Sequence, residues 1–223
     1  MLQNKFILGK ELFKIKFWIV LIPYFLLSSC AYRYTLYSKE FSEIAYSNRH
    51  HQAIYVKYKA VHSALNNAVK RTNNFKIDYA VDSTITLKSY KGSGYDRGHL
   101  KPAAVSKGSV SEMKESFLLS NVAPQYPYFN RVTWRGIEAD VRALLQNQDS
   151  LIVYTGVIYR KRAKRLNKKV EVPYYFYKTI LLGDSTATIA FLAKNDSTSV
   201  KGLDYKISVN KLERHKNLPS THV

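Results

Sequence analysis

The chain has 223 residues, of which 46% are hydrophobic and 23% charged, a balance typical of a folded globular protein rather than a disordered one. Lysine and arginine number 35 against 16 aspartate and glutamate residues, which gives a formal net charge of +19 at pH 7. Such an excess attracts polyanions over a long range. Nucleic acid is therefore the leading partner, and anionic lipid or plain solubility are the alternatives.

The first thirty residues have the pattern of a bacterial export signal. Four lysines precede the apolar run 17–27, which is too short for a comfortable membrane span. The run ends in Leu-Ser-Ser-Cys, similar to a lipobox, and Cys30 is the only cysteine, so no intrachain disulfide can form. We expect residues 1–30 to be a lipoprotein-type signal peptide and Cys30 to carry a lipid that anchors the domain to a periplasmic or cell-surface membrane. The alternative is an uncleaved N-terminal anchor.

The predicted domain follows a short connecting segment. Residues 31–48 contain tyrosine, serine and charge without clear periodicity, and are predicted to be a tether. The domain itself is predicted over 49–210. An alternating apolar pattern over 54–58 is typical of a strand, and 61–69 is predicted to be a short helix or an irregular surface segment.

The middle of the chain is predicted to approach a glycine-containing loop. Alternation over 75–81 and again over 85–87 predicts two strands before the loop formed by Gly-Ser-Gly at 92–94. Residues 111–120 contain helix-forming residues with apolar side chains on one side, which predicts a helix packed against the core.

The second half is predicted to contain one regular helix and several strands. Apolar residues at i, i+3, i+7, i+10 and i+11 predict a helix from about Val132 to Gln146. Further strands are predicted over 151–157, 174–182 and 186–192, with a hairpin turn at Gly183–Asp184. Residues 211–223 are predicted to be a disordered polar tail. Strands, then helices, then more strands indicate an α+β fold rather than a doubly wound one.

Two sequence blocks and three single residues carry the chemical signal. Asp-Arg-Gly-His occupies 96–99, and Leu-Ser-Asn-Val-Ala-Pro-Gln occupies 119–125, followed by Asn130, Trp134 and Glu138. This combination resembles the DNA/RNA non-specific endonuclease family, with its Asp-Arg-Gly-His motif and ββα-metal (His-Me finger) site. The four-residue motif alone would be weak, but the second block and the spacing make the resemblance specific. It implies an α+β fold with a central antiparallel sheet and flanking helices.

The resemblance covers roughly residues 50–195 and implies a Mg²⁺-dependent hydrolase, with Mn²⁺ as a possible substitute. It would cut phosphodiester bonds of DNA and RNA with little sequence specificity and leave 5′-phosphate ends. His99 matches the general base that activates water, and an imidazole with a reference pKa of ~6.5 is largely neutral at working pH. Asn130 matches the direct metal ligand, an oxygen donor suited to a hard cation.

Glu138 matches the acidic residue that orients metal-bound water from behind the metal. Arg97 and Arg142 match arginines that contact phosphate and stabilise developing charge, a task that suits a permanently charged bidentate donor. Arg71 matches more loosely and is a further candidate for phosphate binding. Without the resemblance, Glu138 and Arg142 would be interpreted as an ordinary surface pair one helical turn apart.

The remaining motif residues are expected to support the site rather than to perform chemistry. Asp96, Gly98 and Asn121 are predicted to hold loops and the backbone of His99. Asn130 could also cap a helix, since asparagine is a good N-cap residue, and that role is compatible with metal binding.

A cationic run and an aromatic run lie outside the motif. Seven cations occur among the ten residues 160–169, which would form either a solvated loop or, beside the cleft, a grip on the phosphate backbone or on anionic lipid. Tyr-Tyr-Phe-Tyr at 174–177 is interpreted as a core strand in preference to a base-stacking platform.

Two other functions are compatible with parts of the sequence. A non-catalytic nucleic-acid-binding lipoprotein, for example in DNA uptake, would need the cationic surface but not the His99, Asn130 and Glu138 set. A structural lipoprotein would use the charge on membrane or cell-wall polyanions. Metal-dependent hydrolysis separates the endonuclease from both.

Overall fold

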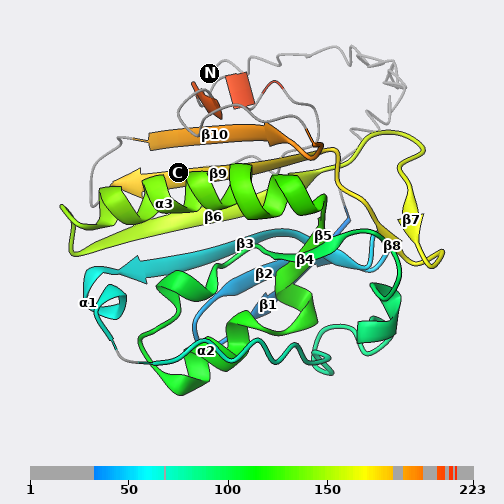
Figure 1. The fold of residues 1–223 in the computed structure, drawn as a ribbon, viewed down its shortest axis with the longest axis horizontal. Helices are drawn as coiled ribbons and strands as arrows, with labels where there is room; N and C mark the ends of the chain where they lie inside the picture. Colours follow the sequence, from blue (N-terminus) through cyan, green and yellow to red (C-terminus); the bar gives the residue numbers. More distant parts are fainter. Residues whose placement is uncertain are drawn as a thin grey trace, which may run out of the picture.

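A seven-stranded antiparallel sheet in the order β1-β2-β3-β6-β9-β10-β11 is the largest element of the fold (Figure 1). The computed structural model describes residues 33–67, 69–182, 188–197, 205–208, 211–212 and 214. The sheet strands are β1 (Thr35–Ser38), β2 (Glu43–Ser47), β3 (Gln52–Val61), β6 (Ser150–Ile158), β9 (Tyr175–Leu182), β10 (Thr188–Lys194) and β11 (Lys206–Ile207). The strands predicted over 54–58, 151–157 and 174–182 are confirmed as β3, β6 and β9.

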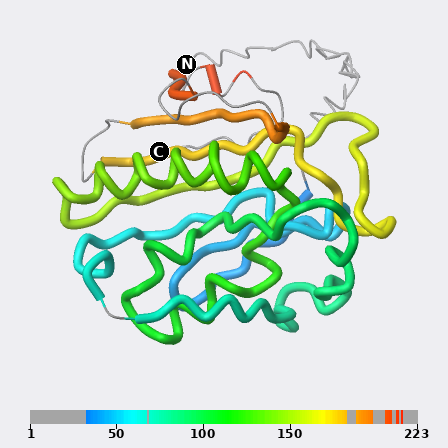
Figure 2. The backbone as a smooth tube through the Cα atoms, viewed as in Figure 1, coloured from blue at the N-terminus to red at the C-terminus, as the bar shows by residue number. Residues whose placement is uncertain are grey.

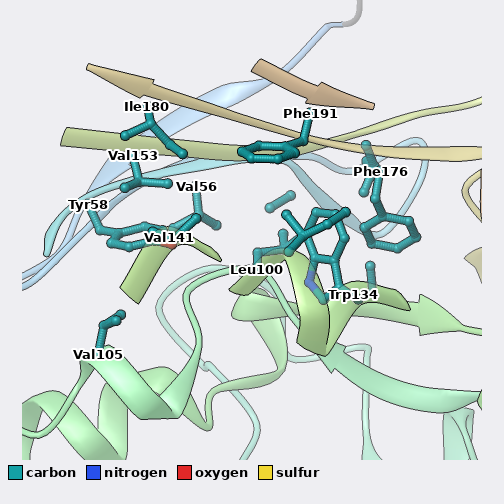
Figure 3. Packing of buried hydrophobic residues seen from close by; sticks show 14 of the residues in the cluster. Val56, Tyr58, Leu100, Val105, Trp134, Val141, Val153, Phe176, Ile180 and Phe191 are labelled. Atoms are coloured by element: carbon teal, nitrogen blue, oxygen red, sulfur yellow. The ribbon is translucent and has the colours of Figure 1, made fainter. Parts of the chain in front are cut away.

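The central strands send alternate side chains to the two faces of the sheet, as the strand period of two requires. Val56 and Val153 join the main core cluster on one face, whereas Tyr55 and Ile158 belong to a separate cluster on the other. Figure 3 shows sheet residues of the main cluster packed against helical ones, with Trp134 at the centre. The main core therefore lies between the sheet and the helical layer.

Helix α3 (Arg135–Leu145) runs along this face of the sheet over β6 and β9 (Figures 1 and 2). Its buried residues, Ile137, Val141 and Leu145, recur every four positions, so one side of the helix faces the core. The helix predicted over 132–146 is confirmed, but its N-terminal end is preceded by a π-helical segment, η4 (Phe129–Trp134). Such segments are rare and occur frequently at functional sites.

The segment between β3 and β6 carries the motif. Its short elements are α1 (His62–Leu65), η1 (Leu87–Ser89), β4 (Asp96–His99), η2 (Ala103–Val105), α2 (Val110–Ser116), η3 (Leu119–Asn121) and β5 (Val122–Gln125). The Asp-Arg-Gly-His motif is β4 itself, and it pairs antiparallel with β5. Because η4 and α3 follow directly, β4, β5 and α3 form a ββα unit. A second insertion, between β6 and β9, forms the hairpin of β7 (Arg165–Leu166) and β8 (Val170–Glu171).

Several predictions for the first half of the chain were wrong. The predicted tether over 31–48 contains β1 and β2, two strands of the main sheet. Because most of β2 is buried on both faces, its side chains do not alternate in polarity, and β1 is a mostly exposed edge strand. The strands predicted over 75–81 and 85–87 are absent among the described residues, where only isolated bridges, Lys76 to Leu118 and Asp78 to Asp82, occur. Phe75, Ile77 and Ile85 pack in a cluster with Val122 of β5 and Val170 of β8, without forming a strand of their own.

The other end of the chain also differs from expectation. Leu212, in the predicted polar tail, is buried against the outer face of the sheet. The signal peptide with Cys30, the turn at Gly183–Asp184 and most of the tail lie outside the described residues. No helix in the described part of the chain is long and apolar enough to cross a membrane.

Candidate active site

His99 is the last residue of β4, and its ring is buried between two aromatic side chains. The ring centroid lies 5.2 Å from that of Phe75 and 4.8 Å from that of Phe117. Among the described residues, the His99 Nε2 atom has no hydrogen-bond partner. An orphaned ring nitrogen in a buried setting is unusual, and it leaves this atom available to a molecule bound in the site.

The charge state of His99 follows from this setting. Burial, and then the positive charges of Arg71 and Arg97, lower the pKa of His99 to about 3. The imidazole is therefore neutral at neutral pH. Because a neutral imidazole has one nitrogen that accepts a proton, His99 is in the protonation state that a general base requires.

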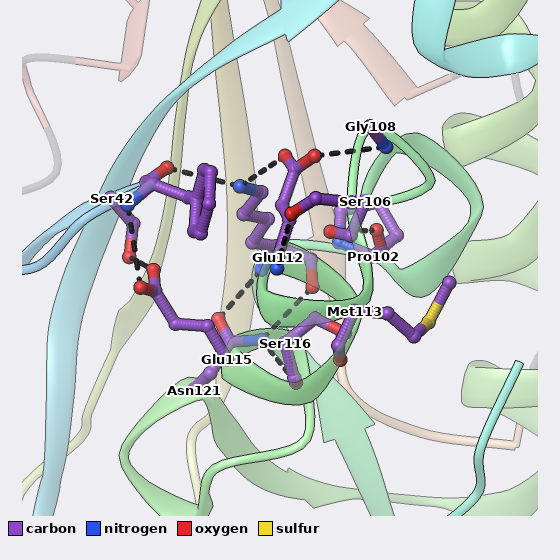
Figure 4. Close-up of polar contacts among 12 residues, drawn as sticks. Ser42, Pro102, Ser106, Gly108, Glu112, Met113, Glu115, Ser116 and Asn121 are labelled. Atoms are coloured by element: carbon purple, nitrogen blue, oxygen red, sulfur yellow. Dashed lines mark hydrogen bonds and ion pairs between the residues drawn. The ribbon is translucent and has the colours of Figure 1, made fainter. Parts of the chain in front are cut away.

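The backbone around His99 is fixed from several sides. The indole nitrogen of Trp134 donates to the His99 carbonyl oxygen at 3.3 Å, and Leu100 N donates to the Asn121 carbonyl oxygen at 2.9 Å. The side-chain amide of Asn121 accepts a hydrogen bond from Lys101 N at 2.9 Å and donates to the Lys101 and Ser116 carbonyl oxygens at 2.9 and 2.7 Å (Figure 4). The supporting role expected for Asn121 thus matches its contacts.

A buried ion pair extends this support. The ammonium of Lys101 lies 2.7 Å from Glu112 Oε1 and also donates to the Phe41 carbonyl oxygen at 3.0 Å. Glu112 in turn accepts from the Gly108 amide at 3.0 Å, so the network joins α2 to the loop after β4 (Figure 4). Removing one charged partner would leave the other buried without compensation.

Gly98 makes room for a neighbouring strand. A Cβ atom at this position would overlap the side chain of Gln125 on β5, which is fully buried. Gly98 and Ala123 are direct partners in the β4–β5 register, so both strands depend on small residues here. This is the structural reason for the glycine between the arginine and the histidine of the motif.

Asn130, in η4, donates from Nδ2 to Asp96 Oδ2 at 2.9 Å. Arg131 binds the same carboxylate with Nε and Nη2, both at 2.9 Å. Although burial favours protonation, these hydrogen bonds and the charges of Arg131 and Arg97 hold the pKa of Asp96 below its usual value. Because an ionised carboxylate only accepts hydrogen bonds, the NH₂ group of Asn130 must face Asp96. Its carbonyl oxygen is the atom left for another partner.

Glu138 projects from the first turn of α3 and is half-buried. Burial raises the pKa of Glu138, and the positive charges of Lys178, Arg142 and Arg71 oppose this effect. The carboxylate therefore depends on neighbouring cations to remain ionised.

Lys178 is a member of this group that the sequence reasoning missed. Its side chain is fully buried on β9, donates to Thr155 Oγ1 at 2.7 Å and to the Leu100 carbonyl oxygen at 3.4 Å, and lies 4.7 Å from the Trp134 ring. Burial lowers the pKa of Lys178 to about 8, opposed by the charge of Glu138. The strand period places it on the same face as the core residues Phe176 and Ile180, and a lysine in that register was the available signal.

His99, Asn130 and Glu138 meet at a pocket of about 220 Å³. It is lined by Arg71, Arg97, His99, Pro102, Ala103, Ala104, Asn130, Arg131, Arg135 and Glu138. An adjoining groove of about 530 Å³ shares Arg71, Arg97 and Asn130 with the pocket. The two hollows therefore form one continuous cationic depression.

Three arginines differ from expectation in whether they line the pocket. Arg142 is not among the described residues that line the pocket; its guanidinium donates to the Glu138 carbonyl oxygen at 3.1 Å, one turn along α3. Arg131 and Arg135 line the pocket instead, and the sequence reasoning did not select them. Arg131 lies in the π-helical segment η4, whereas Arg135 lies in α3 three residues before Glu138, on the same side of that helix.

Comparisons with known proteins identify the family of the chain. The family model for DNA/RNA non-specific endonucleases matches residues 30–221, which is most of the chain. The chain belongs to the DNA/RNA non-specific endonuclease family. A nuclease from Nostoc sp. is 32% identical over an alignment of 185 residues that covers 76% of this chain and 67% of that protein.

Two further matches carry the name endonuclease G or EndoG. Human mitochondrial endonuclease G is 34% identical over an alignment of 126 residues that covers 51% of this chain and 42% of that protein. This chain thus spans about two fifths of its length. In a crystal structure of an EndoG/EndoGI complex, a chain superposes with a TM-score of 0.73 at 26% identity, covering 81% of this chain and 83% of that one. The predicted α+β fold with a central antiparallel sheet is therefore confirmed.

The residues present fit a divalent metal ion. The Asn130 carbonyl oxygen is left over by the Asp96 hydrogen bond, and Glu138 lines the same pocket. No three histidine, cysteine, aspartate or glutamate side chains come together within the described ranges. A hard cation such as Mg²⁺, which keeps several waters and accepts substrate oxygens, suits a site with one amide ligand and one nearby carboxylate.

Proposed function

We propose that this member of the family is a metal-dependent endonuclease that hydrolyses phosphodiester bonds of DNA and RNA with little sequence specificity. The observation that carries the proposal is the neutral His99, whose Nε2 lacks a partner among the described residues, in a pocket that also contains the Asn130 amide and several arginines. A protein that only bound nucleic acid would need the arginines but neither the histidine nor the asparagine.

His99 would take a proton from the attacking water, and water rather than a side chain is the nucleophile. Arg97 and Arg71 would bind the phosphate and stabilise the charge that develops on it. The same two cations lower the pKa of His99 in the free protein, so a bound phosphate that offsets their charge makes the imidazole a stronger base. Proton acceptance is thus coupled to substrate binding.

Asn130 would hold the metal through its carbonyl oxygen, and Glu138 would orient water beside it. A bound Mg²⁺ would supply charge neutralisation for the phosphate. Asp96 keeps Asn130 in the required orientation, and Lys178 with Arg142 favours the ionised form of Glu138. Asp96, Lys178 and Arg142 would therefore support the site without touching the substrate.

The test is cleavage of supercoiled plasmid and of structured RNA in Mg²⁺ or in EDTA. We expect wild-type protein to degrade both substrates only with metal and to leave 5′-phosphate ends, and His99→Ala to bind but not cleave. The matched control is His62→Ala, because His62 contacts Leu145 at the far end of α3. Tight binding without cleavage under any metal would support the non-catalytic alternative.

We also propose that the protein is exported and anchored to a bacterial membrane by a lipid on Cys30, with residues 1–30 as the signal peptide. The support is the sequence pattern, since these residues precede the described chain. Metabolic labelling with a fatty-acid analogue should mark the wild-type protein but not Cys30→Ser. Labelling of both proteins alike, or of neither, would contradict the proposal.

A further inference from the structure

The groove beside the catalytic pocket has an aromatic rim. Tyr95 lines the groove, and its ring centroid lies 4.7 Å from that of Tyr126, with the rings tilted by 49°. Tyr126 directly follows β5 and is 39% exposed. Tyr95 is half-buried, so the more exposed ring of the pair is that of Tyr126. An aromatic pair with one exposed ring, at the edge of a cationic groove, offers a ring surface to a ligand that carries both negative charge and flat apolar groups.

Cations accompany these rings. The Lys164 ammonium lies 5.0 Å from the centroid of the Tyr95 ring. Further along the rim, Arg160 and Lys194 lie 4.9 and 5.6 Å from the ring of Tyr174. Within the described part of the chain, Lys164 and Arg160 form no ion pair with a carboxylate, whereas Lys194 pairs with Asp196 at 3.0 Å. Lys164 can therefore exchange its contact with the ring for a phosphate.

Hydrogen bonds connect the rim into one surface. Asn195 accepts from Tyr126 N at 3.0 Å through Oδ1, and its backbone N–H donates to the Tyr174 carbonyl oxygen at 2.9 Å. The β7–β8 hairpin, which carries Lys164 just before β7, is fixed to the other side of the groove. There Asn167 donates to the Lys88 and Ser89 carbonyl oxygens at 2.9 and 3.0 Å. Figure 2 shows this hairpin projecting beyond β4 and β5.

We propose that Tyr95 and Tyr126 form a stacking subsite for an unpaired base, with Lys164 contacting the adjoining phosphate. A base can stack on the rim only when one of its faces is exposed, so the subsite selects single-stranded DNA or RNA and unpaired segments. The groove shares Arg71, Arg97 and Asn130 with the catalytic pocket, so a strand stacked at the rim continues to the site of hydrolysis. This inference rests on the proposed function and names the substrate class.

The alternative is that the two tyrosines only stabilise the fold. Burial and a hydrogen bond with Tyr126 raise the pKa of Tyr95, so the hydroxyl groups do interact. Two substitutions of Tyr126 distinguish a stacking role from a purely structural one. Tyr126→Phe keeps the ring and removes the hydroxyl, whereas Tyr126→Leu removes the ring and keeps an apolar side chain. A stacking role predicts that only the leucine variant loses affinity.

Binding is measured in EDTA by fluorescence anisotropy with three labelled probes of about 10 nucleotides, a length within the range that single-strand sites occupy. The probes are a single strand, the same strand with abasic sites, and a duplex. We expect the wild type to bind the intact single strand more tightly than the abasic one. Tyr126→Leu should weaken that binding by roughly 5- to 100-fold, the range of a lost base–aromatic contact, and leave the abasic probe unchanged.

Tyr79→Leu is the matched control, because Tyr79 is 78% exposed and does not line the groove. Equal binding of intact and abasic strands by the wild type would overturn the proposal even if a variant failed to fold. Equal losses in the phenylalanine and leucine variants would overturn it as well, since the hydroxyl would then be the active group. Because binding in EDTA needs no hydrolysis, failure of the nuclease proposal would appear separately, as structured RNA and plasmid that both stay intact in Mg²⁺.

Discussion

The side chain of Asn130 is held by Asp96, at 2.9 Å between Nδ2 and Oδ2. The contact joins the first residue of β4 to the π-helical turn before α3, so the two halves of the ββα unit meet at the predicted metal ligand. Because Asp96 is ionised, it determines which end of the amide faces the pocket. Asp96 thus affects the predicted metal site through the orientation that it gives to the Asn130 side chain.

Asp96→Asn should therefore weaken metal binding without abolishing chemistry. Asparagine can donate as well as accept, so it no longer enforces one amide orientation, and losses of about 10- to 100-fold are typical for groups that orient a metal ligand. The measurement is the Mg²⁺ concentration that gives half-maximal plasmid cleavage. Arg131→Gln is the control, since it leaves the Asp96 contact with Asn130 intact. An unchanged Mg²⁺ requirement in Asp96→Asn would contradict this account.

His99 should not titrate in the range that is usual for histidine. Its pKa is lowered to about 3. As the pH falls through about 6.5, the His99 ring therefore stays unprotonated in the folded protein, whereas the same ring takes up a proton in the unfolded chain. Stability from this residue is therefore fully present above roughly pH 6.5 and is lost as pH falls toward 3. NMR of the ring protons, with His99→Ala for assignment, measures this directly. A His99 titration near pH ~6.5 would show that the ring is solvated.

Removing one partner of the Lys101–Glu112 pair should strongly lower the free energy of unfolding. Lys101→Met leaves a buried carboxylate unpaired, which typically costs about 3–5 kcal/mol, whereas replacing both partners by apolar residues is often neutral. Urea denaturation of Lys101→Met and of Lys101→Met/Glu112→Leu tests this. The exposed Lys194–Asp196 pair provides the comparison, and Lys194→Met should change the free energy of unfolding little. If Lys101→Met and Lys194→Met lowered the free energy of unfolding by the same small amount, the buried pair would be no more important for stability than the exposed one.

The sequence predicted those parts of the fold whose side chains repeat with a clear period. The helix over 132–146 was found because one side of α3 is apolar, and β3, β6 and β9 were found from their alternating or continuous apolar runs. Strand β2 was missed because most of it is buried on both faces. Its pairing with β3 is set by tertiary contacts that local patterns do not contain.

The residues of the candidate site were likewise only partly predictable from the sequence. The family pattern selected His99, Asn130 and Glu138, and the structure places all three at one pocket. It did not select Arg135, although this residue lies three residues before Glu138 in α3 and lines the same pocket. Lys178 comes from a strand far along the chain, and only the sheet brings it behind α3.

The salt dependence of binding provides the last prediction. Lys164 stands over Tyr95 at the edge of the groove, whereas Lys59 is exposed on β3 and lines neither the groove nor the pocket. Each phosphate contact that releases a counterion adds about 0.7 to the slope of log affinity against log salt for single strands and about 0.9 for duplex DNA. Lys164→Gln should lower the slope by close to that amount, and Lys59→Gln should leave it unchanged. Equal changes in the two variants would mean that the net charge, and not the groove, sets the affinity.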